Sequence, residues 1–319
     1  MKDRPISFLV PGPIKDLVLA SEVLRQSWKE NRTNFLDYTP EFIQSLLQYP
    51  GDGPVLAPAL YDDGKIVAFV MGFPRRVRLN GEVRRLLLMT FFTVAPAYKG
   101  KGIGKAIWAE CLNEARQAGY DGALHYCVDG EASNLITVRS ACSAGFEARR
   151  VFTVGFMMRP LQSSAEHMHE GTTASGEVFL NAASSLRTEV PVHRIWSAAE
   201  AHWQLHRPGA VCATNRNGGV LTGYVVRGSD AATSSYFFID DILWDRLSPK
   251  DRTEMVTEIT LRAAESASMA VLPILKYADL SPFAAAGFRR VPRLVHAYLT
   301  LWSGALDGTE LPGLYIDVL

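Results

Sequence analysis

The sequence lacks the features that mark secreted, membrane-spanning and nucleic-acid-binding proteins. Its four cysteines stand far apart with no Cys-x-x-Cys pair, and its first residues lack the apolar region of a signal peptide. No apolar run approaches the roughly 18 residues that a membrane span needs. The 33 Lys and Arg residues balance the 33 Asp and Glu residues, which argues against nucleic acid as a principal partner. We therefore expect a cytoplasmic protein that acts on neither membranes nor nucleic acids.

A metal centre is not expected either. His167 and His169 stand in a stretch rich in Ser, Thr and Gly, and no Cys, Asp or third His follows at the fixed spacing of a zinc site. Such a composition is typical of a linker. Because the chain is about twice as long as a typical domain, we expect two domains, residues 1–160 and 178–319, joined by the linker 161–177.

The most informative stretch is residues 86–108. An apolar run over 86–94 predicts a strand, and apolar residues at helical spacing from residue 103 onwards predict a helix. Glycine allows backbone N–H groups to approach a ligand closely, and the N–H groups at a helix N-terminus favour phosphate. The stretch therefore predicts a pyrophosphate-binding turn, formed by glycines and lysines around one isoleucine: Lys99, Gly100, Lys101, Gly102, Ile103, Gly104 and Lys105.

Three other glycine-rich loops do not fit this turn. A Walker loop needs Gly five residues before its Gly-Lys pair and Ser or Thr after it, where this sequence has Lys99 and Ala106. A dinucleotide-binding fingerprint needs its third glycine at position 105, which is Lys. A protein kinase loop is followed by a strand rather than a helix. A turn that needs glycine only for its shape is the remaining alternative.

The turn resembles the acyl-CoA loop of the GNAT superfamily of N-acetyltransferases. The family pattern is Arg or Gln, two residues, Gly, one residue, then Gly or Ala, and Lys99-Gly-Lys-Gly102-Ile-Gly104 matches it except at the first position. Lysine keeps the charge there but loses the planar fork that binds phosphate bidentately. Asn134 and the pair Gly145-Phe146 match the family's second signature. The resemblance covers about the first 160 residues.

Beyond the linker, the same order of predicted elements returns, and Ala286-Gly-Phe echoes Ala144-Gly-Phe. The resemblance then implies an α/β (α+β) fold of two tandem GNAT-like domains, each a mixed, mostly antiparallel sheet flanked by helices. In the second copy, Trp244–Arg252 replaces the glycine turn and contains two acidic residues and no glycine. Because these acids repel phosphate, we expect the second domain to be degenerate and not to bind CoA.

The resemblance implies acetyl-CoA or another acyl-CoA as co-substrate, with no metal. In the family, the strand before the loop and the strand after its helix splay apart, and the pantetheine arm lies in the gap. By that resemblance, the backbone of Phe92 and Val94 would pair with pantetheine, and Asn134 would hydrogen-bond to it. A helix N-cap is the alternative role of Asn134.

The catalytic groups of many GNAT enzymes have no counterpart here. The strand before the loop has no carboxylate where the family places a Glu, and Ala141 stands where the last helix would supply a Tyr. Cys142 is a candidate acid for the leaving sulfur, with buried packing as the alternative. Asp129 and Glu131 are candidate bases, with exposed loop acids as the alternative, and catalysis by positioning alone is also open.

We therefore expect an N-acyltransferase that moves an acetyl or other acyl group from acyl-CoA to an amine of a small-molecule acceptor, by direct attack in a ternary complex. Transfer to a hydroxyl, or of a longer acyl chain lined by Phe91 and Phe92, is a related alternative. A non-catalytic acyl-CoA-binding or regulatory protein is the alternative from another class. Asp240 and Asp241 of the second copy are candidates for a shared cleft. Nothing in the sequence indicates the acceptor's identity or the oligomeric state.

Overall fold

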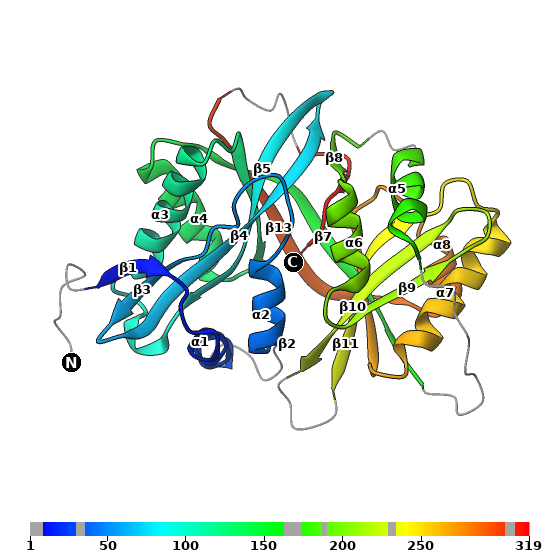
Figure 1. Cartoon of the computed structure of the whole chain (residues 1–319), viewed down its shortest axis with the longest axis horizontal. Coiled ribbons are helices and arrows are strands. Elements are labelled where there is room, and N and C mark those ends of the chain that lie inside the picture. Colours follow the sequence, from blue (N-terminus) through cyan, green and yellow to red (C-terminus); the bar gives the residue numbers. More distant parts are fainter. Residues whose placement is uncertain are drawn as a thin grey trace.

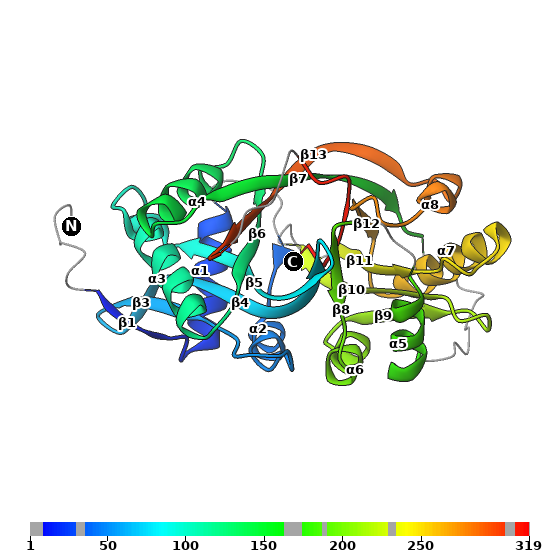
Figure 2. The same cartoon turned by 90° about the horizontal axis from the view of Figure 1, so that it is seen from above.

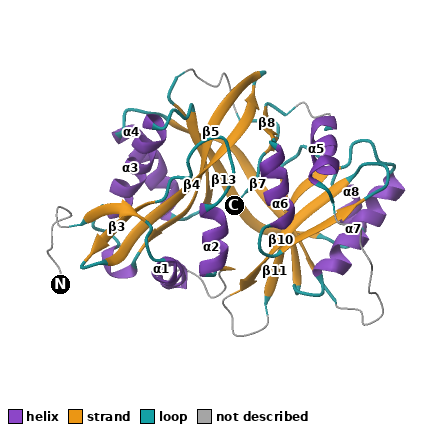
Figure 3. Cartoon of the chain, viewed as in Figure 1, coloured by secondary structure: helices purple, strands orange, loops and turns teal. Residues whose placement is uncertain are grey.

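One mixed sheet of 14 strands runs through both halves of the chain in this computed structural model (Figure 1). The structure describes residues 9–29, 36–162, 174–186, 190–228, 234–303 and 310–318. Helices flank the sheet in each half, so the predicted mixed α/β fold is confirmed (Figure 3). The expected linker lies mostly outside the described residues.

The first half places its long strands and its glycine turn as the sequence predicts. Asn80 and Gly81 both have positive φ values, 50° and 89°, which suits the tight hairpin that joins the long strands on either side of them. Gly119, with φ 76°, follows the end of the helix after the glycine turn. The elements of this half are β1 (Val10–Pro13), α1 (Leu17–Lys29), β2 (Leu36–Asp37), α2 (Pro40–Leu47), β3 (Pro58–Asp62), β4 (Lys65–Leu79), β5 (Glu82–Val94), a 3₁₀ turn (Pro96–Tyr98), α3 (Ile103–Gln117), β6 (Gly122–Val128), α4 (Ala132–Ser143) and β7 (Ala148–Pro160).

The second half has helices that begin at serine N-caps. The side chains of Ser175, Ser197 and Ser248 each accept a hydrogen bond from a first-turn N–H, which satisfies a donor that the helix leaves unpaired. The elements of this half are α5 (Gly176–Ser185), β8 (Val192–Ile195), α6 (Ala198–His206), β9 (Ala210–Thr214), β10 (Val220–Gly228), β11 (Ser235–Leu243), α7 (Pro249–Ala263), β12 (Met269–Ile274), α8 (Ser281–Ala285), β13 (Arg289–Leu301) and β14 (Leu314–Tyr315).

Alternate residues of β4 pack on opposite faces of the sheet. Phe69 and Met71 join a buried cluster with residues of α1 and α2, whereas Ala68 and Val70 join a second cluster with residues of α3. This alternation follows from the two-residue repeat of a strand. The sheet of the first half is therefore covered by α1 and α2 on one face and by α3 and α4 on the other.

The two halves exchange strands. β13, from the end of the chain, lies between β6 and β7 and pairs with both in antiparallel fashion, and β7 continues to pair with β12. Figure 2 shows β7 and β13 running together from one half to the other. β7 is unbroken at Gly155, which pairs with Ile274 of β12 and with Leu294 of β13.

The two halves also repeat one order of elements. In each, a hairpin is followed by a strand, a helix, a parallel strand, a short helix and a long strand, with β5 parallel to β6 and β11 parallel to β12. The tandem arrangement of two GNAT-like domains that the sequence suggests stays a prediction. The division at residues 160 and 178 stays a prediction, because the sheet does not stop there.

Candidate functional site

The glycine turn leads into α3 with no side-chain cap. Gly102 is the N-cap residue, with φ 78° and ψ −1°, and the first turn of α3 has no acidic residue. Glycine adopts this left-handed conformation without steric cost. The first N–H groups of the helix, which have no intrahelical acceptor, are therefore left for an anion. Gly100 also has a positive φ, 76°.

Gly104 brings the first turn of α3 against the strand before it. A Cβ atom added there would lie 2.9 Å from Cζ of Phe92, 3.4 Å from Val94 and 3.7 Å from Ile136. Phe92 and Val94 belong to β5, and Ile136 belongs to the N-terminal part of α4. The turn, the end of β5 and the start of α4, which the sequence predicts to hold a single ligand, thus lie together. Ile103 is buried and anchors the turn.

The side chains of the three lysines in the turn have different surroundings. Nζ of Lys99 donates to the carbonyl oxygen of Ser27 on α1 at 3.2 Å, and Nζ of Lys101 lies 4.9 Å from the centre of the Tyr98 ring. Lys105 is exposed. Lys99 therefore ties the turn to α1, whereas the resemblance led us to expect its side chain to face a ligand.

β5 and β6 stop pairing where the ligand gap is expected. Their parallel pairing ends at Met89 and His125, although both strands continue. One residue later, β5 has a bulge, so that Phe91 and Phe92 have no partners on β4, and Phe91 has φ 54°. A bulky residue with this φ is an outlier that costs about 1–3 kcal/mol, and such strain clusters at functional sites.

Asn134 lies in the first turn of α4 and is held by both halves. Its Nδ2 donates to the carbonyl oxygens of Val128 and Glu131 at 2.6 and 3.1 Å, and its Oδ1 accepts from the Tyr298 hydroxyl at 3.2 Å. The N-cap of α4 is Glu131, so the alternative role of Asn134 as N-cap is wrong. The amide is instead fixed beside the end of β6.

A row of rings links the glycine turn to Asn134. Phe92 packs edge-on against Trp108 at 5.2 Å, Trp108 against His125 at 4.7 Å, and His125 stacks on Tyr298 at 5.4 Å. His125 is 1% exposed, and burial lowers its pKa to about 3. Its imidazole is therefore neutral at physiological pH. The row crosses from α3 to β13, which belongs to the second half.

In the second half, the helix that corresponds to α3 is α7, and its N-terminus is capped by a side chain. Ser248 caps α7 and accepts from the N–H of Asp251, which itself lies in the first turn. The Asp251 carboxylate accepts hydrogen bonds from Ser248 and Asn215, which lower its pKa. A cap and a negative charge thus occupy the positions that α3 leaves open. This supports the expectation that only the first half binds CoA.

The candidate catalytic residues are not brought together. Cys142 is exposed near the end of α4, about 12 Å along the helix from Asn134 at 1.5 Å per residue. Glu131 is half-buried at the start of α4. Asp129 Oδ1 lies 3.0 Å from Nε2 of His296, whose Nδ1 lies 3.2 Å from the Thr153 hydroxyl. Of the three, only Asp129 and Glu131 lie at the open end of β6.

Asp240 and Asp241 belong to a buried network of the second half. A bulge in the pairing of β10 with β11 turns both carboxylates to one face, where they accept from Gln204 Nε2 at 3.2 and 2.7 Å. Arg207 also pairs with Asp240. Burial raises the pKa of both, and that of Asp240 reaches about 6. These acids are therefore already engaged within the protein.

A second ionic group joins the halves near the centre of the molecule. Arg75 of β4 and Arg194 of β8, each with a side chain 1% exposed, donate to Oδ1 of Asp317 at 2.9 and 2.8 Å. Burial opposes the ionisation of Asp317, but the two guanidinium charges outweigh it and lower the pKa. Arg75, on the β4–β5 hairpin, therefore has a structural role.

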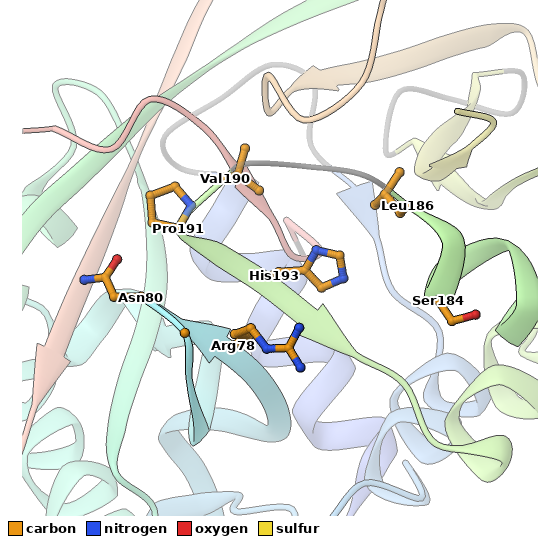
Figure 4. Close-up of a pocket in the computed structure, with 8 residues that line it drawn as sticks. Arg78, Asn80, Ser184, Leu186, Val190, Pro191 and His193 are labelled. Carbon is orange, nitrogen blue, oxygen red and sulfur yellow. The ribbon is translucent and has the colours of Figure 1, made fainter. Parts of the chain in front are cut away.

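A pocket of about 400 Å³ lies at the tip of the β4–β5 hairpin, away from the glycine turn (Figure 4). Arg78 of β4 and His193 of β8 face each other across paired strands, and Ser184 and Asn80 lie at its sides (Figure 4). Burial and the Arg78 charge lower the pKa of His193. None of the residues expected to bind acyl-CoA lines this pocket.

Among the described residues, no group of three His, Cys, Asp or Glu side chains is placed to hold a metal ion, and His167 and His169 lie outside them. Within the same part of the chain, every helix is too short or too polar to cross a bilayer. The cytoplasmic location stays a prediction.

Sequence reasoning missed the residues that come from far along the chain. Tyr298 donates a hydrogen bond to Asn134 although 164 residues separate them in the sequence. No local sequence pattern predicts such a contact.

Comparisons with known proteins agree with this geometry. The model of the acetyltransferase (GNAT) family matches residues 21–146, and no curated protein matches the chain. Solved structures of Saccharomyces cerevisiae N-myristoyltransferase with bound myristoyl-CoA are similar. One has a TM-score of 0.73 at 13% identity over 93% of this chain and 82% of that chain. Another has 0.71 at 14% over 97% and 87%, and a third, which also contains inhibitors, has 0.70 at 14% over 92% and 80%.

Proposed function

Because residues 21–146 form a domain of the acetyltransferase (GNAT) family, we propose that the chain is an acyltransferase that moves an acyl group from acyl-CoA to an amine. The observation that carries the proposal is the uncapped N-terminus of α3, formed by Gly102 beside the point where β5 and β6 stop pairing. A helix N-terminus with free N–H groups and no acid suits a pyrophosphate.

The rest of the cofactor would follow the gap between the strands. The backbone at Phe92 and Val94 lies past the bulge of β5 and would pair with pantetheine as an added strand does. Asn134 would contact the same arm from α4, because its amide is held beside Val128 at the end of β6. The turn from Lys99 to Lys105 would hold the pyrophosphate, with Lys101 and Lys105 supplying charge.

In the reaction, an acceptor amine attacks the thioester carbon and the CoA thiolate leaves. An aliphatic amine with a pKa near ~10 is mostly protonated at neutral pH, so a base must remove a proton before attack. Asp129 and Glu131 are the candidates for this base, since both lie at the open end of β6. Cys142 remains a candidate acid by its chemistry, but its exposed position on α4 supports it less.

The acyl group is acetyl or a longer chain. The resemblance of the first half to N-acetyltransferases favours acetyl and a small-molecule amine. The likeness to N-myristoyltransferase bound to myristoyl-CoA extends over 92–97% of this chain and favours a long acyl chain as the second candidate. Phe91 and Phe92, at the bulge, are the side chains expected to meet the first carbons of either group.

Two measurements on the full chain test the proposal. Calorimetry with CoA should detect binding, and free thiol should form from acyl-CoA in the presence of an amine. A series from acetyl-CoA to myristoyl-CoA, against small amines and peptide amines, would identify the acyl length and the acceptor class. Binding without thiol release under every condition would favour the non-catalytic acyl-CoA-binding alternative. Absence of CoA binding would contradict both functions.

A further inference from the structure

Buried polar side chains without hydrogen-bond partners gather where β5 and β6 separate. Among the described residues, they include Thr93 Oγ1 on β5, and both ring nitrogens of His125 and the hydroxyl of Tyr126 on β6. Leaving a buried polar group unpaired is costly, and native proteins do so rarely. Thr93 and Tyr126 belong to the two strands that border the space expected to hold acyl-CoA, so a bound thioester would supply a partner for a hydroxyl on this side.

Tyr126 is placed differently from its neighbours on β6. His125 packs against Trp108 of α3, and Cys127 lies 3.5 Å from Thr137 of α4, so their side chains face these helices. Tyr126 lies between them and projects from the other face, where it packs against the large cluster that spans both halves. It is also the first residue of β6 past the last pair with β5.

We propose that the Tyr126 hydroxyl donates a hydrogen bond to the reacting thioester of bound acyl-CoA. This inference rests on the acyltransferase function proposed above. It supplies a donor that the GNAT resemblance expects elsewhere, since the matching position on α4 is Ala141, which is fully buried and has no polar side-chain group. Tyr126 lies on the strand that borders the gap, instead of on the helix.

The role is stabilisation of charge and not transfer of a proton. As the amine nitrogen bonds to the carbonyl carbon, the carbon–sulfur bond breaks and its electron pair stays on sulfur. The amine proton passes to a base or to water, and the thiolate takes up a proton from water. Burial raises the pKa of Tyr126 well above its usual value, so the phenol keeps its proton throughout. A fixed donor of this kind favours the charge that develops in the transition state.

The test compares Tyr126→Phe with Tyr120→Phe. Tyr120 is also buried, and its hydroxyl donates to the carbonyl oxygen of Pro54 at 2.5 Å. We expect Tyr126→Phe to lower kcat roughly 10²-fold, with KM for acyl-CoA and Kd for CoA unchanged. Because the hydroxyl is unpaired in the free protein, the melting temperature should stay the same or rise. Tyr120→Phe should lower the melting temperature and leave kcat unchanged.

Each outcome has one meaning. Wild-type kcat in a folded Tyr126→Phe variant overturns the inference and leaves the acyltransferase function intact. The inference is also overturned if the free energy of unfolding falls by as much as the activation free energy rises. That result would assign the hydroxyl a structural role. If the wild-type chain releases no thiol from any acyl-CoA, the proposed function fails and this inference fails with it.

Discussion

Replacing Gly102 by alanine is the most direct test of the pyrophosphate site. Gly102 has φ 78° at the N-cap of α3, where an L-residue costs roughly 1–2 kcal/mol. The variant must either keep this strain or rotate residue 102 out of the left-handed region. Rotation would turn the first N–H groups of α3 away from the ligand.

The size of the expected effect follows from the loss of one hydrogen bond to phosphate. One hydrogen bond from an N–H group to a charged phosphate contributes about 1.5–3 kcal/mol. Losing it would raise the dissociation constant of CoA roughly 10- to 100-fold. The folding stability should fall by about the strain alone, roughly 1–2 kcal/mol. Binding is measured by calorimetry and stability by urea unfolding.

Gly287→Ala is the matched control. Gly287 follows α8 in the second half, has φ 92°, and a Cβ atom there would meet nothing within 4 Å. This variant has the same kind of backbone strain and should lose similar stability, but it should bind CoA as the wild type does. If a folded Gly102→Ala variant also binds CoA with wild-type affinity, the assignment of the site to the N-terminus of α3 is refuted.

Three further predictions follow from buried or exposed groups. Asp317→Asn removes the charge that Arg75 and Arg194 share, so the free energy of unfolding in urea should fall by about 3–5 kcal/mol; a loss near zero would contradict the pairing. The Asp240 carboxyl, whose pKa burial raises to about 6 from 3.8, should titrate near pH 6 in carbon-13 NMR. Because the pKa of Asp240 is higher in the folded than in the unfolded chain, its contribution to stability is greatest at low pH and is lost as the pH rises through 6. An NMR titration midpoint near pH 4 would refute the burial of this carboxyl. Cys142→Ser should leave kcat unchanged, and a large fall would restore the thiol as the acid.

The sequence predicted the glycine turn because its determinants are local. An apolar strand, three glycines and a helical pattern lie within residues 86–108, and each has a structural consequence independent of the rest of the chain. The hairpin at Asn80 and Gly81 is predictable for the same reason. The sequence also shows that α3 begins at a glycine without a capping side chain, whereas α7 begins at Ser248.

Other parts of the site depend on contacts that no local pattern contains. The hydrogen bond between Tyr298 and Asn134 requires β13 to lie beside β6, and strand pairing over such a distance is not encoded in either segment alone. The left-handed φ of Phe91 runs against the preference of bulky residues, so tertiary packing must impose it. Asp317 lies in a short apolar segment, and nothing nearby indicates that two arginines surround it.

The exchange of strands has a consequence for biosynthesis. A ribosome releases β6 and β7 long before it makes β13, since residues 161–288 lie between them. Until that strand emerges, the nascent chain exposes two open sheet edges, which are templates for association with other chains. The first half therefore cannot complete its sheet before residues 289–301 have been made, and a gene fragment that encodes the first half alone should yield an aggregating product.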